Sequence, residues 1–267
     1  MVLEKYKQKR NFTSSPEPSG DATLAAERAK KAPRDGLFFC VQKHLASHLH
    51  YDFRLEYKGV LLSWAVPKGP SLDPKTKRLA MHVEDHPNEY GTFEGVIPEG
   101  YGAGIVMLWD QGTWTPEADD VDAALKKGDL KFTLDGYKLK GSWVLVRTGG
   151  RYPGGSGDRS WLLIKHKDDW AGDLDITTFA PLSVKSEGDF AEILADGNPE
   201  IWTSNRPAQG GETGAMFAKI IERALEMKAG RGAPAAERVP RSAGRAARGA
   251  EETKTKKKKP AAKRRTT

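Results

Sequence analysis

Short β-like segments, separated by glycine and proline, follow one another from Arg34 onward and limit the folds open to this chain. The separators include Pro67–Lys68–Gly69–Pro70 and Gly100–Tyr101–Gly102, which are turn signals. Many short strands punctuated in this way favour an antiparallel barrel or sandwich over parallel strands joined by helices. We therefore predict a mainly β protein, a compact antiparallel β-barrel with a few short helices, one of them at residues 121–127. The expected strands are residues 37–41, 50–57, 60–66, 79–84, 105–109, 131–134, 139–147 and 161–166.

Changes in composition divide the chain into four predicted segments. Residues 1–33 form an N-terminal arm rich in charge, serine and proline, with a helical stretch at 22–32. The barrel is expected over residues 34–185. Residues 186–229 form a linker and a short amphipathic helix, because apolar residues recur at helical spacing between 215 and 228. Residues 230–267 form a disordered basic tail, since they lack the apolar residues that a folded core requires.

The charge of the chain is concentrated at its C-terminal end. The net charge is +7, yet residues 206–267 hold 17 Lys and Arg against 6 Asp and Glu, which leaves residues 1–205 mildly acidic. A basic tail on such a body indicates a nucleic-acid-binding appendage. The single cysteine, Cys40, excludes an internal disulfide, and no apolar run approaches the length of a membrane span. We expect a monomer in the cytoplasm, associated with the nucleoid.

Side chains that can bind a metal or a phosphate are most concentrated in the strand expected at residues 50–57. Strand alternation places His50, Asp52, Arg54 and Glu56 on one face, with apolar residues on the other. The simpler interpretation is a solvent face over a core. The alternative is a metal site, in which His50 and Asp52 chelate one divalent ion and His44 on the preceding strand adds a third ligand. Two nitrogens and a carboxylate suit Mn²⁺, Zn²⁺, Co²⁺ or Ni²⁺, and Arg54 offers a fork for a phosphate oxygen.

Other histidines are weaker candidates. His86 and Tyr90 follow a strand in a proline-containing loop, where functional residues are common. His82 alternates with apolar neighbours and is expected to be structural. His48 falls in the turn between the candidate ligands, and His166 follows a buried-looking strand, so neither is expected to bind metal.

A family resemblance joins these segments. The run from Phe39 to Glu56, with residues 64–69, 84–95 and 97–104 and the pair Trp109–Asp110, closely resembles the 3′-phosphoesterase domain of bacterial DNA ligase D. The likeness covers roughly residues 4–185. It implies a small β-barrel that uses manganese during break repair. Such a domain removes a 3′-terminal ribonucleoside and then the remaining 3′-phosphate, leaving a 3′-OH for ligation.

The resemblance also implies roles for individual residues. His44, His50 and Asp52 become the metal ligands, with Gln42 alongside in substrate binding. The other assignments are phosphate contacts from Arg54, Lys68 and Arg78, a general acid or transition-state donor in His86, and orientation of substrate or water by Tyr90.

The arm carries part of the resemblance. Arg10 and Glu17 fall where the family places an essential arginine and glutamate, although composition alone suggests that residues 1–20 add little to stability. Asn11, which the resemblance groups with the substrate-binding residues, stands where the family typically has an aspartate. This departure could weaken an arm contact or one of the two activities.

Three functions compete at this point. The first is a metal-dependent phosphodiesterase and phosphomonoesterase on DNA or RNA–DNA 3′ ends. The second is a non-catalytic end-binding or scaffold protein in break repair. The third, an esterase for small phosphorylated metabolites, is disfavoured by the basic tail. No Lys-x-Asp-Gly motif is present, so we expect a stand-alone phosphoesterase that works with a separate ligase or polymerase and other end-joining factors.

Overall fold

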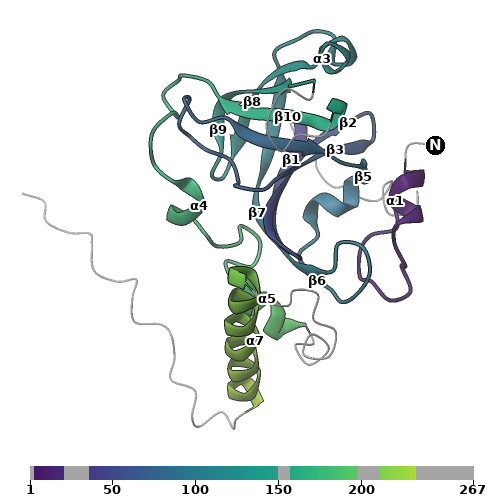
Figure 1. Cartoon of the computed structure of the whole chain (residues 1–267), viewed down its shortest axis with the longest axis vertical. Coiled ribbons are helices and arrows are strands. Elements are labelled where there is room, and N and C mark those ends of the chain that lie inside the picture. Colours follow the sequence, from purple (N-terminus) through teal and green to yellow (C-terminus); the bar gives the residue numbers. More distant parts are fainter. Residues whose placement is uncertain (1–2, 21–35, 150–156, 198–210, 233–267) are drawn as a thin grey trace, which may run out of the picture. The chain divides into compact units, whose positions relative to one another are not determined.

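Ten strands form one sheet in the computed structural model, which describes residues 3–20, 36–149, 157–197 and 211–232 (Figure 1). Eight of them close into an antiparallel barrel in the order β1-β2-β3-β4-β10-β9-β8-β7, because β7 pairs again with β1. The short strands β5 and β6 pair with β3 and β7. The strands are β1 Leu37–Leu45, β2 Leu49–Tyr57, β3 Val60–Val66, β4 Arg78–His82, β5 His86–Pro87, β6 Gly95–Ile97, β7 Gly104–Pro116, β8 Asp129–Gly136, β9 Lys140–Arg147 and β10 Ser160–Lys165.

The predicted strands and the helix at 121–127 are confirmed, although several bounds differ in either direction. Strand β4 ends at His82, for example, and not at the expected residue 84. The strand expected at 105–109 continues as β7 to Pro116. The helix expected at 121–127 is α3, Val121–Lys127, where the Asp120 side chain accepts from the Ala123 amide and Gly128 ends the helix in a left-handed conformation. Other helical segments within the described ranges are α1 Glu4–Gln8, η1 Asn88–Thr92, η2 Gly157–Arg159, α4 Ile176–Phe179, α5 Phe190–Asp196 and α7 Gly211–Gly232.

Two expected segments fall partly or wholly outside the described residues. The helical stretch at 22–32 lies there, as do residues 233–267 of the tail. None of the helices in the described part of the chain combines the length and apolar character that crossing a membrane requires.

The barrel interior holds the main hydrophobic core. Strand alternation sends Tyr51, Phe53 and Leu55 of β2 inward, where they join four fully buried tryptophans, Trp64, Trp109, Trp114 and Trp143. Apolar side chains of α5 and α7 belong to the same cluster, including Phe190, Leu194, Phe217 and Ile221. The segment expected to link barrel and tail thus contributes to the core through both helices.

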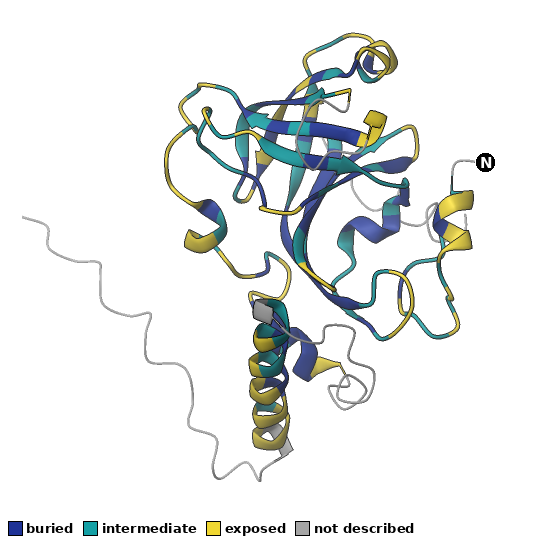
Figure 2. Cartoon of the chain, viewed as in Figure 1, coloured by how far each residue is buried: buried dark blue, intermediate teal, exposed yellow. Residues whose placement is uncertain are grey.

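A second apolar cluster lies on the outer face of the barrel and fixes the arm there. Tyr6 of α1 is fully buried, against Phe38 and Cys40 of β1 and Tyr90 of η1. Phe12 packs at its edge. Figure 2 shows the burial of η1 between the arm and the barrel. Residues 3–20 of the arm are therefore an integral layer over the outer face of β1 and β2, and not the dispensable extension that their composition suggests.

Candidate functional site

Pairing between β1 and β2 brings the sequence-predicted ligands together. His44 lies opposite His50, and Gln42 lies opposite Asp52 in the antiparallel register. Opposed residues of two antiparallel strands point to the same face, which here is the outer face of the barrel. The expectation that His50, Asp52 and Arg54 share one face is confirmed.

This outer face is not a solvent face, so the simpler interpretation of the alternation is wrong. The exposed fractions are 5% for His44, 8% for Asp52 and 2% for Arg54. The arm and the segment from β5 to η1 cover them. Glu56, the next residue on this face, accepts hydrogen bonds from the Phe38 amide and the Asn88 side chain and ties β2 to that cover.

The two histidines are held in tautomers that suit metal binding. His44 Nε2 lies 2.9 Å from the carbonyl oxygen of Gly102, and His50 Nδ1 lies 2.9 Å from that of His48. A carbonyl only accepts, so each of these nitrogens carries the proton and the other ring nitrogen keeps a free lone pair. These are His44 Nδ1 and His50 Nε2, which lie 3.5 and 3.8 Å from Asp52 Oδ2.

The donor set therefore fits a divalent metal. The ligand atoms of His44, His50 and Asp52 all lie within 4.8 Å of one another. Burial lowers the pKa of His50, which keeps the imidazole neutral and able to coordinate. Burial opposes the charge of Asp52, but Arg54 and the two histidines lower the pKa of its carboxyl group far below the usual range. Two imidazole nitrogens and one carboxylate oxygen suit Mn²⁺, Zn²⁺ or Co²⁺.

Arg54 sits beside the candidate ligands in a network of protein contacts. Its Nη2 lies 3.1 Å from Asp52 Oδ2, its Nε donates to Gln42 Oε1 at 2.8 Å, and its Nη1 donates to Ser63 Oγ at 2.8 Å. These contacts engage Nε and part of both terminal nitrogens, so Arg54 would give a phosphate a single hydrogen bond rather than a bidentate pair.

Gln42 acts mainly through its neighbours. It is fully buried, and its Nε2 donates to the backbone oxygens of Tyr90 and Phe93 at 3.0 and 2.9 Å. Its Oε1 accepts from Arg54. All of its polar atoms are engaged by protein, so Gln42 positions Arg54 and η1 rather than facing a ligand.

His86 lies between two guanidinium groups. Its Nδ1 is 2.8 Å from the carbonyl oxygen of Glu84 and 2.9 Å from Arg54 Nη1, and its Nε2 is 3.0 Å from Arg10 Nη2. Burial, with the charges of Arg54 and Arg10, lowers the pKa of His86 well below its usual value. The imidazole is neutral here, with its Nδ1 proton directed to the Glu84 carbonyl and its Nε2 accepting from Arg10. The Tyr90 ring lies beside it, 4.8 Å between centroids.

The arm supplies charged groups to the surroundings of His86. Arg10 Nε donates to Glu17 Oε1 at 2.8 Å, and its guanidinium lies 4.0 Å from the centroid of the Tyr6 ring. Its Nη1 is 3.3 Å from Glu84. Both members of the Arg10–Glu17 ion pair are buried, with side chains 5% and 1% exposed. Arg10 and His86, which are far apart in the sequence, are therefore in contact over the face that carries the candidate ligands.

Three sequence-predicted residues stand apart from this cluster. Asn11 is exposed and caps a turn of the arm, where its Oδ1 accepts from the amide and hydroxyl of Thr13. Lys68 is exposed in the turn after β3, and Arg78 begins β4 with its Nε buried. Neither Lys68 nor Arg78 lines the cavity around the candidate ligands.

The remaining histidines behave as structural residues. His82 packs against the rings of Trp64 and Trp161, and His166 Nδ1 lies 2.8 Å from Ser142 Oγ. His48 is exposed in the β1–β2 turn. None of the three was expected to bind metal.

Three residues that support the candidate site were not predicted from the sequence. Ser63 lies opposite Arg54 in the β2–β3 pairing, and a lone serine in the apolar run of β3 was the available signal. Glu84 binds both Lys9 and Arg10, and Gly102 orients His44 through its backbone carbonyl. No side-chain pattern encodes that last contact.

A cavity of about 250 Å³ opens over this cluster. It is lined by the candidate ligands together with Arg54, His86, Tyr90, Arg10 and Glu17. The arrangement combines a candidate metal-binding triad, two arginines and a neutral imidazole in one partly enclosed volume. Such a site can neutralise the charge that builds on a phosphoester during its hydrolysis.

Comparison with known proteins agrees with this chemistry. Residues 42–147 match the family described as DNA Ligase D 3′-phosphoesterase domain. The barrel belongs to this phosphoesterase family. The chain is 49% identical over 217 residues to the multifunctional non-homologous end joining protein LigD of Pseudomonas aeruginosa, a match that covers 79% of this chain and 24% of the relative. LigD of Mycobacterium bovis is 44% identical over 167 residues, covering 62% of this chain and 20% of that protein. The chain thus spans about a quarter or less of the length of these LigD relatives.

Proposed function

We propose that this chain is a divalent-metal-dependent phosphoesterase that heals 3′ ends of DNA and RNA–DNA strands in break repair. It removes a 3′-terminal ribonucleoside and then the 3′-phosphate, leaving a 3′-OH for a separate ligase or polymerase in non-homologous end joining. The observation that carries the proposal is the convergence of two imidazole lone pairs and one carboxylate beside a buried arginine. Membership of the LigD phosphoesterase family supports it.

His44, His50 and Asp52 would hold the metal ion, for which Mn²⁺ is the leading candidate and Co²⁺ or Zn²⁺ the alternatives. When bound, such an ion supplies positive charge to the phosphoryl oxygens and acidity to a water molecule. Both histidines are already oriented by backbone carbonyls, so metal binding needs little rearrangement of their rings.

The proposed function comprises two successive hydrolysis reactions, in which the protein's own residues bind and orient the substrate. In the first reaction, water adds to phosphorus, the bond from phosphorus to O5′ of the terminal ribonucleoside breaks, and O5′ takes up a proton. In the second, the bond from phosphorus to O3′ breaks in the same way and releases inorganic phosphate. Arg54 holds a phosphoryl oxygen beside the metal ligands, and Tyr90 orients the substrate.

His86 is the proposed proton donor. A phosphate bound between Arg54 and Arg10 would offset the two guanidinium charges that lower the pKa of His86. The imidazole can then carry a proton on Nε2 to the leaving oxygen. Arg10, held by Glu17, closes this side of the site. Lys68 and Arg78 remain proposed contacts to phosphates farther along the strand.

Turnover with and without Mn²⁺ tests the proposal, using primer–templates that end in one ribonucleotide or in a 3′-phosphate. His44→Ala, His50→Ala and Asp52→Ala should each reduce both activities about 100-fold or more, because a site with one ligand missing binds the metal poorly. Unchanged thermal unfolding would show that the fold is retained. Near-wild-type turnover by any of these variants at saturating Mn²⁺ would remove that residue from the ligand set.

The same assay separates the two rival functions. Tight binding to 3′ ends without turnover under any metal would identify a non-catalytic end-binding or scaffold protein. Faster turnover of free nucleoside 3′-monophosphates than of DNA ends would identify an esterase for small metabolites.

A further inference from the structure

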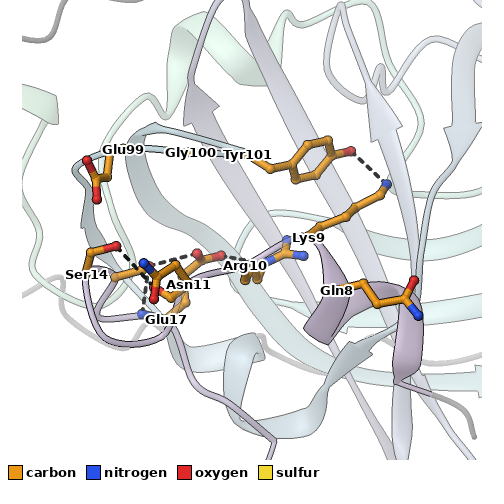
Figure 3. A pocket seen from close by; sticks show the side chains of 10 residues that line it. Gln8, Lys9, Arg10, Asn11, Ser14, Glu17, Glu99, Gly100 and Tyr101 are labelled. Atoms are coloured by element: carbon orange, nitrogen blue, oxygen red, sulfur yellow. Dashed lines mark hydrogen bonds and ion pairs between the residues drawn. The ribbon is translucent and has the colours of Figure 1, made fainter.

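A second, larger cavity of about 460 Å³ adjoins the candidate metal site (Figure 3). One wall comes from the arm, and the other is the loop between β6 and β7. Arg10, Glu17 and Tyr101 line both cavities, so the two volumes share a boundary. The second cavity falls in the size range of pockets that hold small molecules.

Tyr101 gives this cavity an aromatic surface. It is 50% exposed, although large apolar side chains are usually covered. Lys9 holds it from one side, with Nζ 4.4 Å from the ring centroid and 3.3 Å from the phenolic oxygen. Figure 3 shows this contact among the side chains that line the cavity. A tyrosine ring fixed in this way can stack on a nucleobase, which every base permits because each has a π-face.

The same loop also serves the metal site. Gly102 follows Tyr101 directly and adopts a left-handed backbone, with φ of +79°, that places its carbonyl oxygen against His44 Nε2. The loop therefore fixes the distance between the aromatic surface and the candidate ligands. A base stacked on Tyr101 would belong to a nucleoside next to the reacting phosphate.

The charges lining the second cavity favour an uncharged occupant. Lys9 pairs with Glu84 at 2.9 Å and is neutralised there. Arg10 pairs with Glu17 at 2.8 Å, and it also lines the first cavity, where it faces the phosphate that reacts. Glu99 adds an exposed carboxylate at the rim. A second phosphate would meet no uncommitted positive charge there. A 3′-terminal nucleoside fits, since it has no phosphate beyond the one being cleaved.

We infer that this cavity binds the 3′-terminal ribonucleoside that leaves during phosphodiester cleavage. Its base stacks on Tyr101, and its ribose hydroxyls donate to Glu99, a contact that carboxylates commonly make with ribose. Asn11 also lines this cavity, and its Oδ1 is already engaged by Thr13. The inference rests on the proposed function and adds to it the site of the leaving group.

A pair of substrates that differ only at the end tests this inference. One primer–template ends in a ribonucleoside, which would fill the cavity, and the other ends in a 3′-phosphate, which leaves it empty. Tyr101→Ala and Glu99→Ala in the full chain should lower the ratio of kcat/KM on the first substrate to kcat/KM on the second. For Tyr101→Ala we expect a drop of about tenfold or more, the usual effect of removing an aromatic stacking partner.

The matched control is Tyr137→Ala. Tyr137 is 73% exposed in the β8–β9 turn and lines neither cavity, so its loss should leave the ratio unchanged. An equal loss on both substrates in Tyr101→Ala would show that the cavity does not serve the leaving nucleoside, and unchanged kcat/KM on both substrates would show that it holds no nucleoside. Either result overturns the inference while leaving the proposed function in place. A wild-type chain inactive on both substrates would overturn the two together.

Discussion

Gly104→Ala should weaken metal binding without replacing any candidate ligand. Gly104 begins β7 beside the end of β1, and a Cβ there would lie 2.7 Å from His44 Nε2 and 2.5 Å from the backbone oxygen of Leu45. Both distances are below van der Waals contact, and Leu45 O belongs to a strand backbone that cannot turn aside. The His44 ring must therefore move away from the Gly102 carbonyl that sets its tautomer at 2.9 Å.

The size of the effect follows from that lost contact. Removing a hydrogen bond that orients a ligating histidine typically costs 10- to 100-fold in metal affinity, or about 1.4–2.8 kcal/mol. Overpacking at the β1–β7 pairing should lower the free energy of unfolding by a further ~1–3 kcal/mol. The two losses have separate readouts, because one concerns Mn²⁺ and the other concerns the metal-free protein.

Isothermal titration of Mn²⁺ into the metal-free protein, with urea unfolding in parallel, measures both. Gly172→Ala is the matched control, since no heavy atom lies within 4 Å of the Cβ it would add. A Gly104→Ala protein that is destabilised yet binds Mn²⁺ as tightly as wild type would refute the role given to the Gly102 contact. Unchanged affinity in His44→Ala as well would remove His44 from the metal site altogether.

Three further predictions concern the arm, the barrel and the tail. Deletion of residues 1–20 should abolish turnover and also lower the melting temperature, because fully buried Tyr6 and the Arg10 ion pair are lost with it; equal melting temperatures would contradict this. Burial raises the pKa of Asp110 to about 6. Its contribution to stability is thus present below about pH 4 and lost as the pH rises to about 6, by up to ~3 kcal/mol. Wild type should lose stability relative to Asp110→Asn over that interval in urea unfolding, and a constant difference would argue against it. Residues 232–267 carry 12 Lys and Arg against 3 Asp and Glu. Their removal should flatten the plot of log affinity for long duplex DNA against log salt concentration, by roughly 0.9 in slope per lost phosphate contact. Identical slopes would exclude a role of the tail in holding the duplex.

The β architecture could be predicted from local sequence because its signals are local. Alternating apolar residues and glycine–proline punctuation mark strand positions without reference to the rest of the chain. Helix α3 was predictable for the same reason, since Asp120 caps its N-terminal end and Gly128 ends it in a left-handed conformation. The candidate ligand set could also be proposed from the sequence, because alternation along β2 puts His50 and Asp52 on one face.

Burial of that face could not be predicted from the alternation. A polar strand face normally meets solvent, and here the arm and η1 cover it through Tyr6 and Tyr90, which are 84 positions apart in the chain. The sequence resemblance suggested a role for Arg10, but only the fold shows that it reaches His86. Predicting such a contact requires the packing of distant segments, which no local pattern encodes.

The sequence by itself determined the strands, the barrel class and the three candidate metal ligands, because each depends on spacing within one or two neighbouring segments. The tertiary structure decided how those ligands are held. The carbonyl oxygens of Gly102 and His48 fix which nitrogen of each histidine stays free, and Gln42 and Ser63 fix the direction of Arg54. Backbone carbonyls look alike in any sequence, so only the folded path of the chain determines which histidine each one meets.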